Sequence, residues 1–265
     1  MKPPFDSPSD LPYIDRKELQ TVALLTRTVE VVRYNEIKYV HKFMGYLSQP
    51  SSFATEIKNH QQVLGSRFVP KLYNVVTHNG ANRGLLLEFV DGNNLSDLSS
   101  PIGPAERYHI TSLILAAIED FESRGYYPQD LKCANIVLRD HDKSLFIVDL
   151  GDGFSEGMYL EEAVRASGQG SILAAHMLYT LGRTVWELWI DDVPPGDRSE
   201  KAPDSLPLVI CGLINDCCSG TRFKTVGEVK EQYLEKLVAS EKKYLYQYSS
   251  TLASTKSARR AVHVR

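Results

Sequence analysis

Residues 126–138 read YYPQDLKCANIVL, and residues 144–153 read SLFIVDLGDG. The first stretch contains D-L-K-x-x-N, which begins at Asp130 and runs into an apolar segment. The second stretch is an apolar segment that ends in D-L-G, which begins at Asp149. The two apolar segments, 136–138 and 145–148, flank the polar residues 139–143, and this pattern predicts a β-hairpin.

Together the two stretches resemble the catalytic loop and the metal-binding D-F-G motif of protein kinases. Either motif alone also fits an ordinary surface helix start or an Asp-Gly turn, because both patterns are common. Their joint occurrence, with Asp149 placed 19 residues after Asp130, favours the kinase interpretation. The resemblance implies an α+β, bilobal fold with a small antiparallel β N-lobe and a mainly helical C-lobe.

The resemblance also implies roles for four side chains. Phosphoryl transfer depends mainly on positioning and on neutralisation of charge. Asp130 would orient the acceptor hydroxyl and take its proton, while Lys132 would offset the charge of the transferring phosphoryl group. Asn135 and Asp149 would give amide and carboxylate oxygens to Mg²⁺, which prefers oxygen ligands. ATP and Mg²⁺ are therefore the expected substrate and cofactor.

Upstream segments agree with this interpretation. Strands are predicted at 19–24, 29–34 and 37–44, followed by an amphipathic helix at 53–64. The apolar face of that helix is expected to contain Phe53, Ile57, His60 and Leu64.

In the third strand, residues 39–42 read Tyr-Val-His-Lys and take the place of the kinase V-A-I-K motif. Lys42 is the lysine of this motif. By resemblance, Lys42 would grip the phosphates of the nucleotide and Glu56 of the helix would pair with it. Taken alone, Lys42 fits a solvated lysine of an edge strand better than a phosphate-binding residue, and it is the helix with Glu56 that favours the second interpretation. Exposed ion pairs contribute little stability, so the expected value of the pair is geometric.

Segments 68–76 and 83–95 resemble the strands that lead into the kinase hinge. By resemblance, Leu87 would be the gatekeeper, and the backbone of Glu88 and Val90 would bind adenine. Val40 and Val137 would enclose the adenine ring from its two faces. Residues 85–87 also fit a plain buried strand, and the two interpretations are compatible.

The second half of the chain predicts helices at 105–124, 177–189, 207–218 and 226–237. The expected organisation is a disordered segment at 1–18, an N-lobe at 19–90, a C-lobe at 91–239 and a polar, basic tail at 240–265. Arg222 stands where the kinase C-lobe has its usual arginine.

Four features depart from the kinase pattern. The turn at 25–28 contains no glycine, although backbone amides approach a phosphate most easily without an intervening side chain. Pro128-Gln129 replaces the H-R of H-R-D, and no A-P-E segment occurs between Asp149 and Gly182. Met177 stands where an aspartate normally braces the catalytic loop. The stretch from Asp149 to Gly182 is short for a kinase activation segment. In this respect the chain resembles a group of fungal kinase-like proteins.

Composition narrows the remaining possibilities. The 265 residues are 43% hydrophobic and 24% charged, with a formal net charge of −3, which argues against general nucleic-acid binding. No apolar stretch is long enough to span a bilayer, and no signal peptide is visible. Four cysteines without a C-x-x-C motif indicate reduced thiols, so an intracellular location, cytoplasmic or nuclear, is expected.

Three functions remain open at this stage. The first is an ATP-dependent kinase that acts on serine or threonine of a protein substrate. The second is a pseudokinase, a binding or scaffolding module that keeps the fold and transfers nothing. The third is a small-molecule kinase, because the missing A-P-E segment removes the feature most closely tied to peptide substrates.

Overall fold

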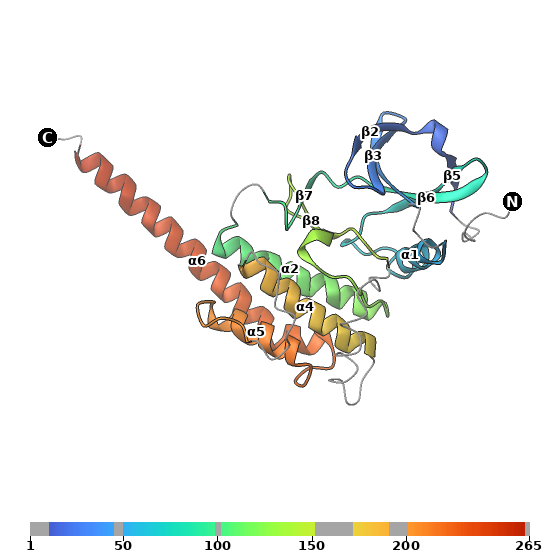
Figure 1. Ribbon diagram of the computed structural model, residues 1–265. Helices are drawn as coiled ribbons and strands as arrows, with labels where there is room; N and C mark the ends of the chain where they lie inside the picture. Colours follow the sequence, from blue (N-terminus) through green and yellow to red (C-terminus); the bar gives the residue numbers. More distant parts are fainter. Residues whose placement is uncertain (1–10, 45–49, 99–101, 152–171, 191–200, 263–265) are drawn as a thin grey trace. The chain divides into compact units, whose positions relative to one another are not determined.

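The computed structural model describes residues 11–44, 50–98, 102–151, 172–190 and 201–262 (Figure 1). The chain divides into two compact units. The first contains the described residues up to Leu95 together with those from Asp120 to 151, and the second contains the rest. A mostly antiparallel sheet comes first and a helical region follows, so the prediction of an α+β, kinase-like fold is confirmed. The lobe boundaries drawn from the sequence stay a prediction.

The first unit is built on a six-stranded sheet. Its strands, in chain order, are β1 (Tyr13–Asp15), β2 (Gln20–Leu24), β3 (Val29–Tyr34), β4 (Ile37–Phe43), β5 (Leu72–His78) and β6 (Ala81–Glu88). Their spatial order is β1-β5-β6-β4-β3-β2, and every pair is antiparallel except β1 with β5. This sheet contains the three N-terminal strands that the alternating apolar residues predict.

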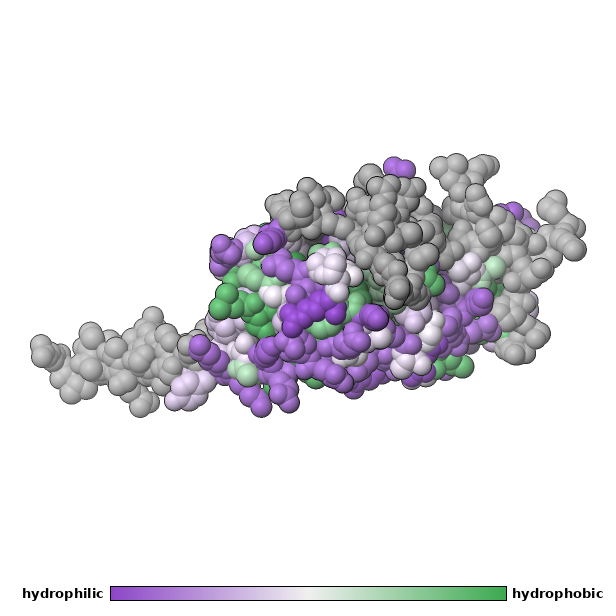
Figure 2. Space-filling model, turned by 90° about the horizontal axis from the view of Figure 1, so that it is seen from below, coloured by the Kyte–Doolittle hydropathy of each residue, from purple (hydrophilic) through white to green (hydrophobic). Residues whose placement is uncertain are grey.

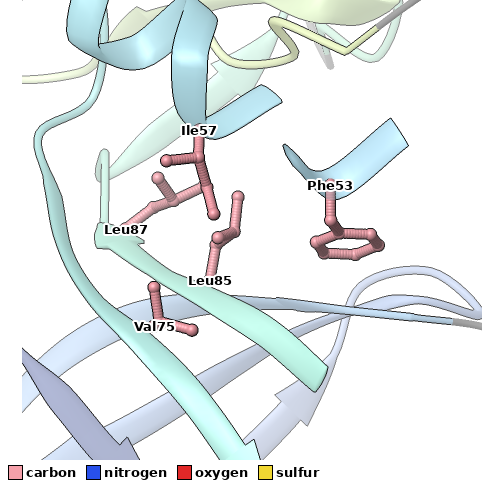
Figure 3. Close-up of a cluster of buried hydrophobic side chains, with 5 residues drawn as sticks. All are labelled: Phe53, Ile57, Val75, Leu85 and Leu87. Carbon is pink, nitrogen blue, oxygen red and sulfur yellow. The ribbon is translucent and has the colours of Figure 1, made fainter. Parts of the chain in front are cut away.

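Each face of this sheet has its own apolar core. Helix α1 (Pro50–Gln62) covers one face, where Phe53 and Ile57 pack with Val75, Leu85 and Leu87 (Figure 3). Ile57 is fully buried, and full burial of such a side chain contributes about 2 kcal/mol. The packing therefore fixes α1 against β5 and β6.

The opposite face explains why the chain is ordered earlier than the sequence predicts. Ile14 and Leu19 are 5% exposed and pack with Val32, Val76 and Leu86. They flank a 3-10 turn, η1 (Arg16–Glu18), which is closed by a capping box between Asp15 and Glu18. The prediction of disorder is wrong for residues 13–18, because two apolar side chains among the prolines and charges complete this core. Residues 1–10 lie outside the described part of the chain.

The predicted hairpin is present in the first unit. Strands β8 (Ile136–Arg139) and β9 (Leu145–Ile147) pair antiparallel, with Ile136 opposite Ile147. A short strand, β7 (Gly92–Asn94), pairs with β8 and completes a three-stranded sheet. The 3-10 turn η2 (Cys133–Asn135) leads directly into β8.

The second unit is helical. Its helices are α2 (Pro104–Ser123), whose last residues belong to the first unit, α4 (Ile172–Ile190), α5 (Leu208–Ser219) and α6 (Val226–Val262). The predicted apolar stripe of α2 is buried, as Ile110, Ile114 and Ile118 are each 0% exposed. The indole of Trp189 in α4 donates to the Thr111 hydroxyl of α2 at 3.1 Å.

Two further predictions differ from the structure. Leu64 is not on the buried face of α1, because the helix ends at Gln62, and the Leu64 side chain is 74% exposed. The segment 240–262, expected to be part of a solvated tail, continues helix α6 to Val262. Two ring contacts hold the earlier part of helix α6 in place. Tyr233 packs edge-to-face on Phe223, and the ring of Tyr244 contacts that of Tyr108.

Gly84 in β6 is required by the ring of His41 in β4. A Cβ atom at Gly84 would lie 2.4 Å from His41 Nε2 and 2.7 Å from the Lys42 carbonyl oxygen. The ring cannot move away freely, because His41 Nδ1 is 2.7 Å from the buried Glu30 carboxylate. We expect Gly84→Ala to lower the free energy of unfolding by about 2 kcal/mol, measured by chemical denaturation.

The matched control is Gly103→Ala, since a Cβ atom there meets nothing within 4 Å. It should change the free energy of unfolding by less than about 0.5 kcal/mol. Equal stability of the two variants would show that β4 and β6 are not packed as described.

Candidate functional site

The centre of the site is the Lys42 ammonium group, which lies between two carboxylates. Lys42 Nζ donates to Glu56 Oε1 at 2.8 Å and to Asp149 Oδ1 at 2.9 Å. The Glu56 side chain is only 3% exposed, whereas that of Asp149 is 37% exposed. Three segments far apart in the sequence, β4, α1 and the D-L-G motif, therefore meet at one ammonium group within the first unit.

The charges of this cluster support one another. Burial by itself lowers the pKa of Lys42, but the nearby Glu56 and Asp149 carboxylates outweigh it and raise this pKa above its usual value. Burial likewise favours a higher pKa for Asp149, but Lys42 and the Gly151 backbone N–H outweigh it and leave this pKa below its usual value. The Lys42 ammonium and the Asp149 carboxylate are thus both charged at neutral pH.

Helix α1 positions more than Glu56. One turn further on, Asn59 Nδ2 donates to the Leu150 carbonyl oxygen at 2.6 Å, and the Tyr126 hydroxyl reaches the same oxygen at 3.3 Å. These two side chains fix the D-L-G backbone directly beside Asp149. The sequence analysis did not single out either residue. The signal available for Asn59 is its position three residues after Glu56, on nearly the same helix face.

The catalytic-loop residues form a second cluster in the same unit. Asp130 Oδ2 accepts from Lys132 Nζ at 2.7 Å and from Asn135 Nδ2 at 3.0 Å. Asn135 Nδ2 also donates to the Asp130 carbonyl oxygen at 2.9 Å. The structure therefore brings Asp130, Lys132 and Asn135 together, as the motif predicts.

The hydrogen bonds leave three oxygens without a partner among the described residues: Oδ1 of Asp130, Oδ1 of Asn135 and Oδ2 of Asp149. The Asn135 amide uses its NH₂ group on Asp130, so its oxygen is the atom left to bind a ligand. The Val148 N–H donates to the Asn135 carbonyl oxygen at 3.0 Å, which places Asn135 beside the strand that leads to Asp149. One amide oxygen and one carboxylate oxygen fit Mg²⁺, which usually keeps several waters and binds phosphates as well.

The residues expected at adenine lie on two different sheets. Val40 of β4 stands opposite Leu87 of β6, whereas Val137 of β8 stands opposite Phe146. The Glu88 N–H already donates to the Lys71 carbonyl oxygen at 2.8 Å. Val90 makes no hydrogen bond with another described residue. The Val90 N–H is thus available to a ligand, while the adenine site itself stays a prediction.

Two positions in the second unit relate to the kinase pattern: Met177 departs from it, and Arg222 matches it. Met177 is fully buried in α4 and Arg222 Nη1 bonds to Asp216, to which the Tyr233 hydroxyl also donates. Residues 152–171, which follow the D-L-G motif, lie outside the described part of the chain. The expectation that this segment has no A-P-E anchor stays a prediction.

Comparison with known proteins gives partial matches. No family model matches the chain. A probable serine/threonine-protein kinase, zyg-1 of Caenorhabditis briggsae, is 28% identical over 123 residues, which are 45% of this chain and 17% of that protein. Serine/threonine-protein kinase D of Synechocystis sp. is 31% identical over 83 residues, which are 31% of this chain and 16% of that protein.

Both relatives are serine/threonine protein kinases. The chain thus has weak, partial similarity to these enzymes, which suggests a protein kinase-like family. The matched stretches are less than a fifth of either relative. What the whole chain does is therefore argued from its own residues.

Within the described ranges, no helix combines the length and the apolarity needed to cross a membrane. Figure 2 shows a face of the molecule on which hydrophilic side chains predominate and hydrophobic ones form small patches.

His60 of α1 introduces a pH dependence next to the site. Its side chain is 4% exposed, and Nε2 has no hydrogen-bond partner among the described residues. Burial, and then the Lys42 charge, lower its pKa to about 4, so the ring is neutral in the folded protein at pH 7. In the unfolded chain the ring takes up a proton near pH 6.5.

The unfolded state therefore binds this proton more tightly than the folded state, and stability is lost as the pH falls from about 6.5 to about 4. We expect His60→Leu to abolish about 3 kcal/mol of that loss, measured as the free energy of unfolding against pH. His78→Leu, at an exposed position of β5, is the control and should follow the wild-type curve. Parallel curves for wild type and His60→Leu would contradict the burial of a neutral ring.

Proposed function

We propose that this chain transfers the γ-phosphoryl group of ATP to a serine or threonine hydroxyl of a protein, with Mg²⁺ as cofactor. The observation that carries the proposal is the Lys42 ammonium bonded to both Glu56 and Asp149. Exposed ion pairs contribute little stability, so two carboxylates around one partly buried lysine are better explained by their geometry. They aim the ammonium group and leave one oxygen of Asp149 for a metal ion. The partial similarity to serine/threonine kinases supports the same reaction.

Each polar group has a place in the proposed reaction. The Oδ1 atom of Asp130 accepts the proton of the acceptor hydroxyl, whose oxygen then bonds to the γ-phosphorus while the bond to the ADP oxygen breaks. Lys132, held 2.7 Å from Asp130, offsets charge on the transferring group. Asn135 and Asp149 hold Mg²⁺, which neutralises charge on the phosphates when it is bound. Lys42 grips the phosphates, and Glu56 keeps it in place.

The same proposal assigns the residues that contact adenine and the two lobes of the chain. The Glu88 carbonyl and the Val90 N–H bind adenine, and Val40 and Val137 enclose it. Residues 19–90 act as the N-lobe and 91–239 as the C-lobe, with a protein substrate as partner. A small-molecule acceptor is the variant of this function that the missing A-P-E motif favours.

A second function is favoured by one observation. The N–H groups of Leu25 and Thr26, in the turn where kinases carry glycines, both donate to the Val29 carbonyl oxygen. Amides used in this way cannot cradle phosphates. A pseudokinase that binds a partner and transfers nothing is therefore the competing proposal.

The purified 265-residue chain should show stabilisation by Mg·ATP and Mg-dependent phosphoryl transfer. A ligand at 100 times its Kd stabilises the folded state by about 2.7 kcal/mol, so a rise in melting temperature is expected at millimolar ATP. Asp149→Asn and Lys42→Ala should remove most of this rise, because they delete a metal ligand and the phosphate cation. Asp130→Asn should keep the rise and abolish turnover, since Asp130 serves the acceptor.

Two results would decide against the proposal. A rise in melting temperature without turnover in wild type would favour the pseudokinase. Wild-type turnover in Asp130→Asn would show that the assigned base is wrong. Arg33→Ala, in β3, is a control that should leave both measurements unchanged.

A further inference from the structure

The turn between β2 and β3, residues 25–28, has almost no backbone donors left for a ligand. The Leu25 and Thr26 N–H groups donate to the Val29 carbonyl oxygen at 2.9 and 3.0 Å. The Thr28 N–H donates to the Thr26 hydroxyl oxygen at 3.2 Å. Of the four amides, only that of Arg27 makes no hydrogen bond with a described residue. Any anion bound at this turn must therefore be held mainly by a side chain.

The turn lies at the Lys42 end of the β3–β4 pair. Val31 stands opposite Val40, and Val29 stands opposite Lys42. The Phe43 N–H then donates to the Thr28 carbonyl oxygen at 2.8 Å, which ties the turn to the residue after Lys42. Val40 marks the expected position of adenine, and Lys42 marks that of the phosphates. The turn therefore lies beyond Lys42, on the side away from adenine.

Arg27 is the basic residue of this turn. Its side chain is exposed and forms no hydrogen bond or ion pair with any described residue. A guanidinium group is planar, permanently charged and able to donate two parallel hydrogen bonds to a phosphate. It reaches outward from the backbone, so it does not need the close approach for which glycine is used.

We propose that Arg27 binds the terminal phosphate of the nucleotide and replaces the missing backbone amides of the turn with one charged side chain. This inference rests on the proposed function. Lys42, which is held by two carboxylates, serves the inner phosphates, and Arg27 serves the outermost one. Because the contact is between exposed charges, it weakens as ionic strength rises.

The test compares Mg·ATP with Mg·ADP on the full chain by isothermal titration calorimetry. Arg27→Ala should weaken Mg·ATP binding about tenfold or more and change Mg·ADP binding less than about twofold, because only ATP has the terminal phosphate. Arg27→Lys should retain part of the ATP affinity, since it keeps the charge and loses the bidentate geometry. Raising the salt concentration should narrow the difference between wild type and Arg27→Ala.

Arg83→Ala, at an exposed position of β6, is the control and should bind both nucleotides as wild type does. Without nucleotide, Arg27→Ala should melt at the wild-type temperature, because the side chain bonds to none of the described residues. If wild type and Arg27→Ala bind Mg·ATP equally, the inference is overturned and the proposed function stands. If wild type binds neither nucleotide, the proposed function fails and the inference with it. Equal weakening of ATP and ADP would also overturn the assignment to the terminal phosphate.

Discussion

The structure of the first unit depends on one partly buried cation, the Lys42 ammonium, and on the two carboxylates that surround it. That cation stabilises the charge of Glu56, whose side chain is 3% exposed, because a buried charge is strongly unfavourable unless it is paired. The same contact connects β4, α1 and the D-L-G motif. The apolar core under α1 and the Asn59 contact to Leu150 hold these elements in register around the cation.

Some parts of the site match the kinase pattern and one part departs from it. The lysine, its two carboxylates, the Asp130 cluster and the free amide oxygen of Asn135 form a consistent set for phosphoryl transfer. The turn between β2 and β3 has instead become self-contained, with its amides bonded to Val29 and Thr26. An exposed arginine at that turn resolves the conflict, because a charged side chain can bind a phosphate where the backbone no longer can.

The sequence predicted the elements that periodicity and motif spacing define. The strands around Lys42, the hairpin after Asp130 and the α1 face with Ile57 were all found near the expected residues. Order at Ile14 was missed, because apolar residues are few in this segment and the burial of Ile14 comes from β3, β5 and β6. Asn59 and Tyr126 were missed because their partner is a backbone carbonyl, which no sequence pattern marks. The length of α6 was missed because its continuation lacks an apolar stripe that local periodicity could detect.

The most direct test of the interaction between Lys42 and its carboxylates is a double-mutant cycle with Lys42→Met and Glu56→Gln, measured by chemical denaturation without nucleotide. Lys42→Met should lower the free energy of unfolding by about 3 kcal/mol, because it leaves the Glu56 carboxylate buried without its cation. Glu56→Gln should destabilise the wild type, but it should restore stability in the Lys42→Met background by at least about 1 kcal/mol, because it removes a buried carboxylate whose lysine is gone. If Glu56→Gln has the same effect in both backgrounds, the two residues do not interact and the described site is wrong.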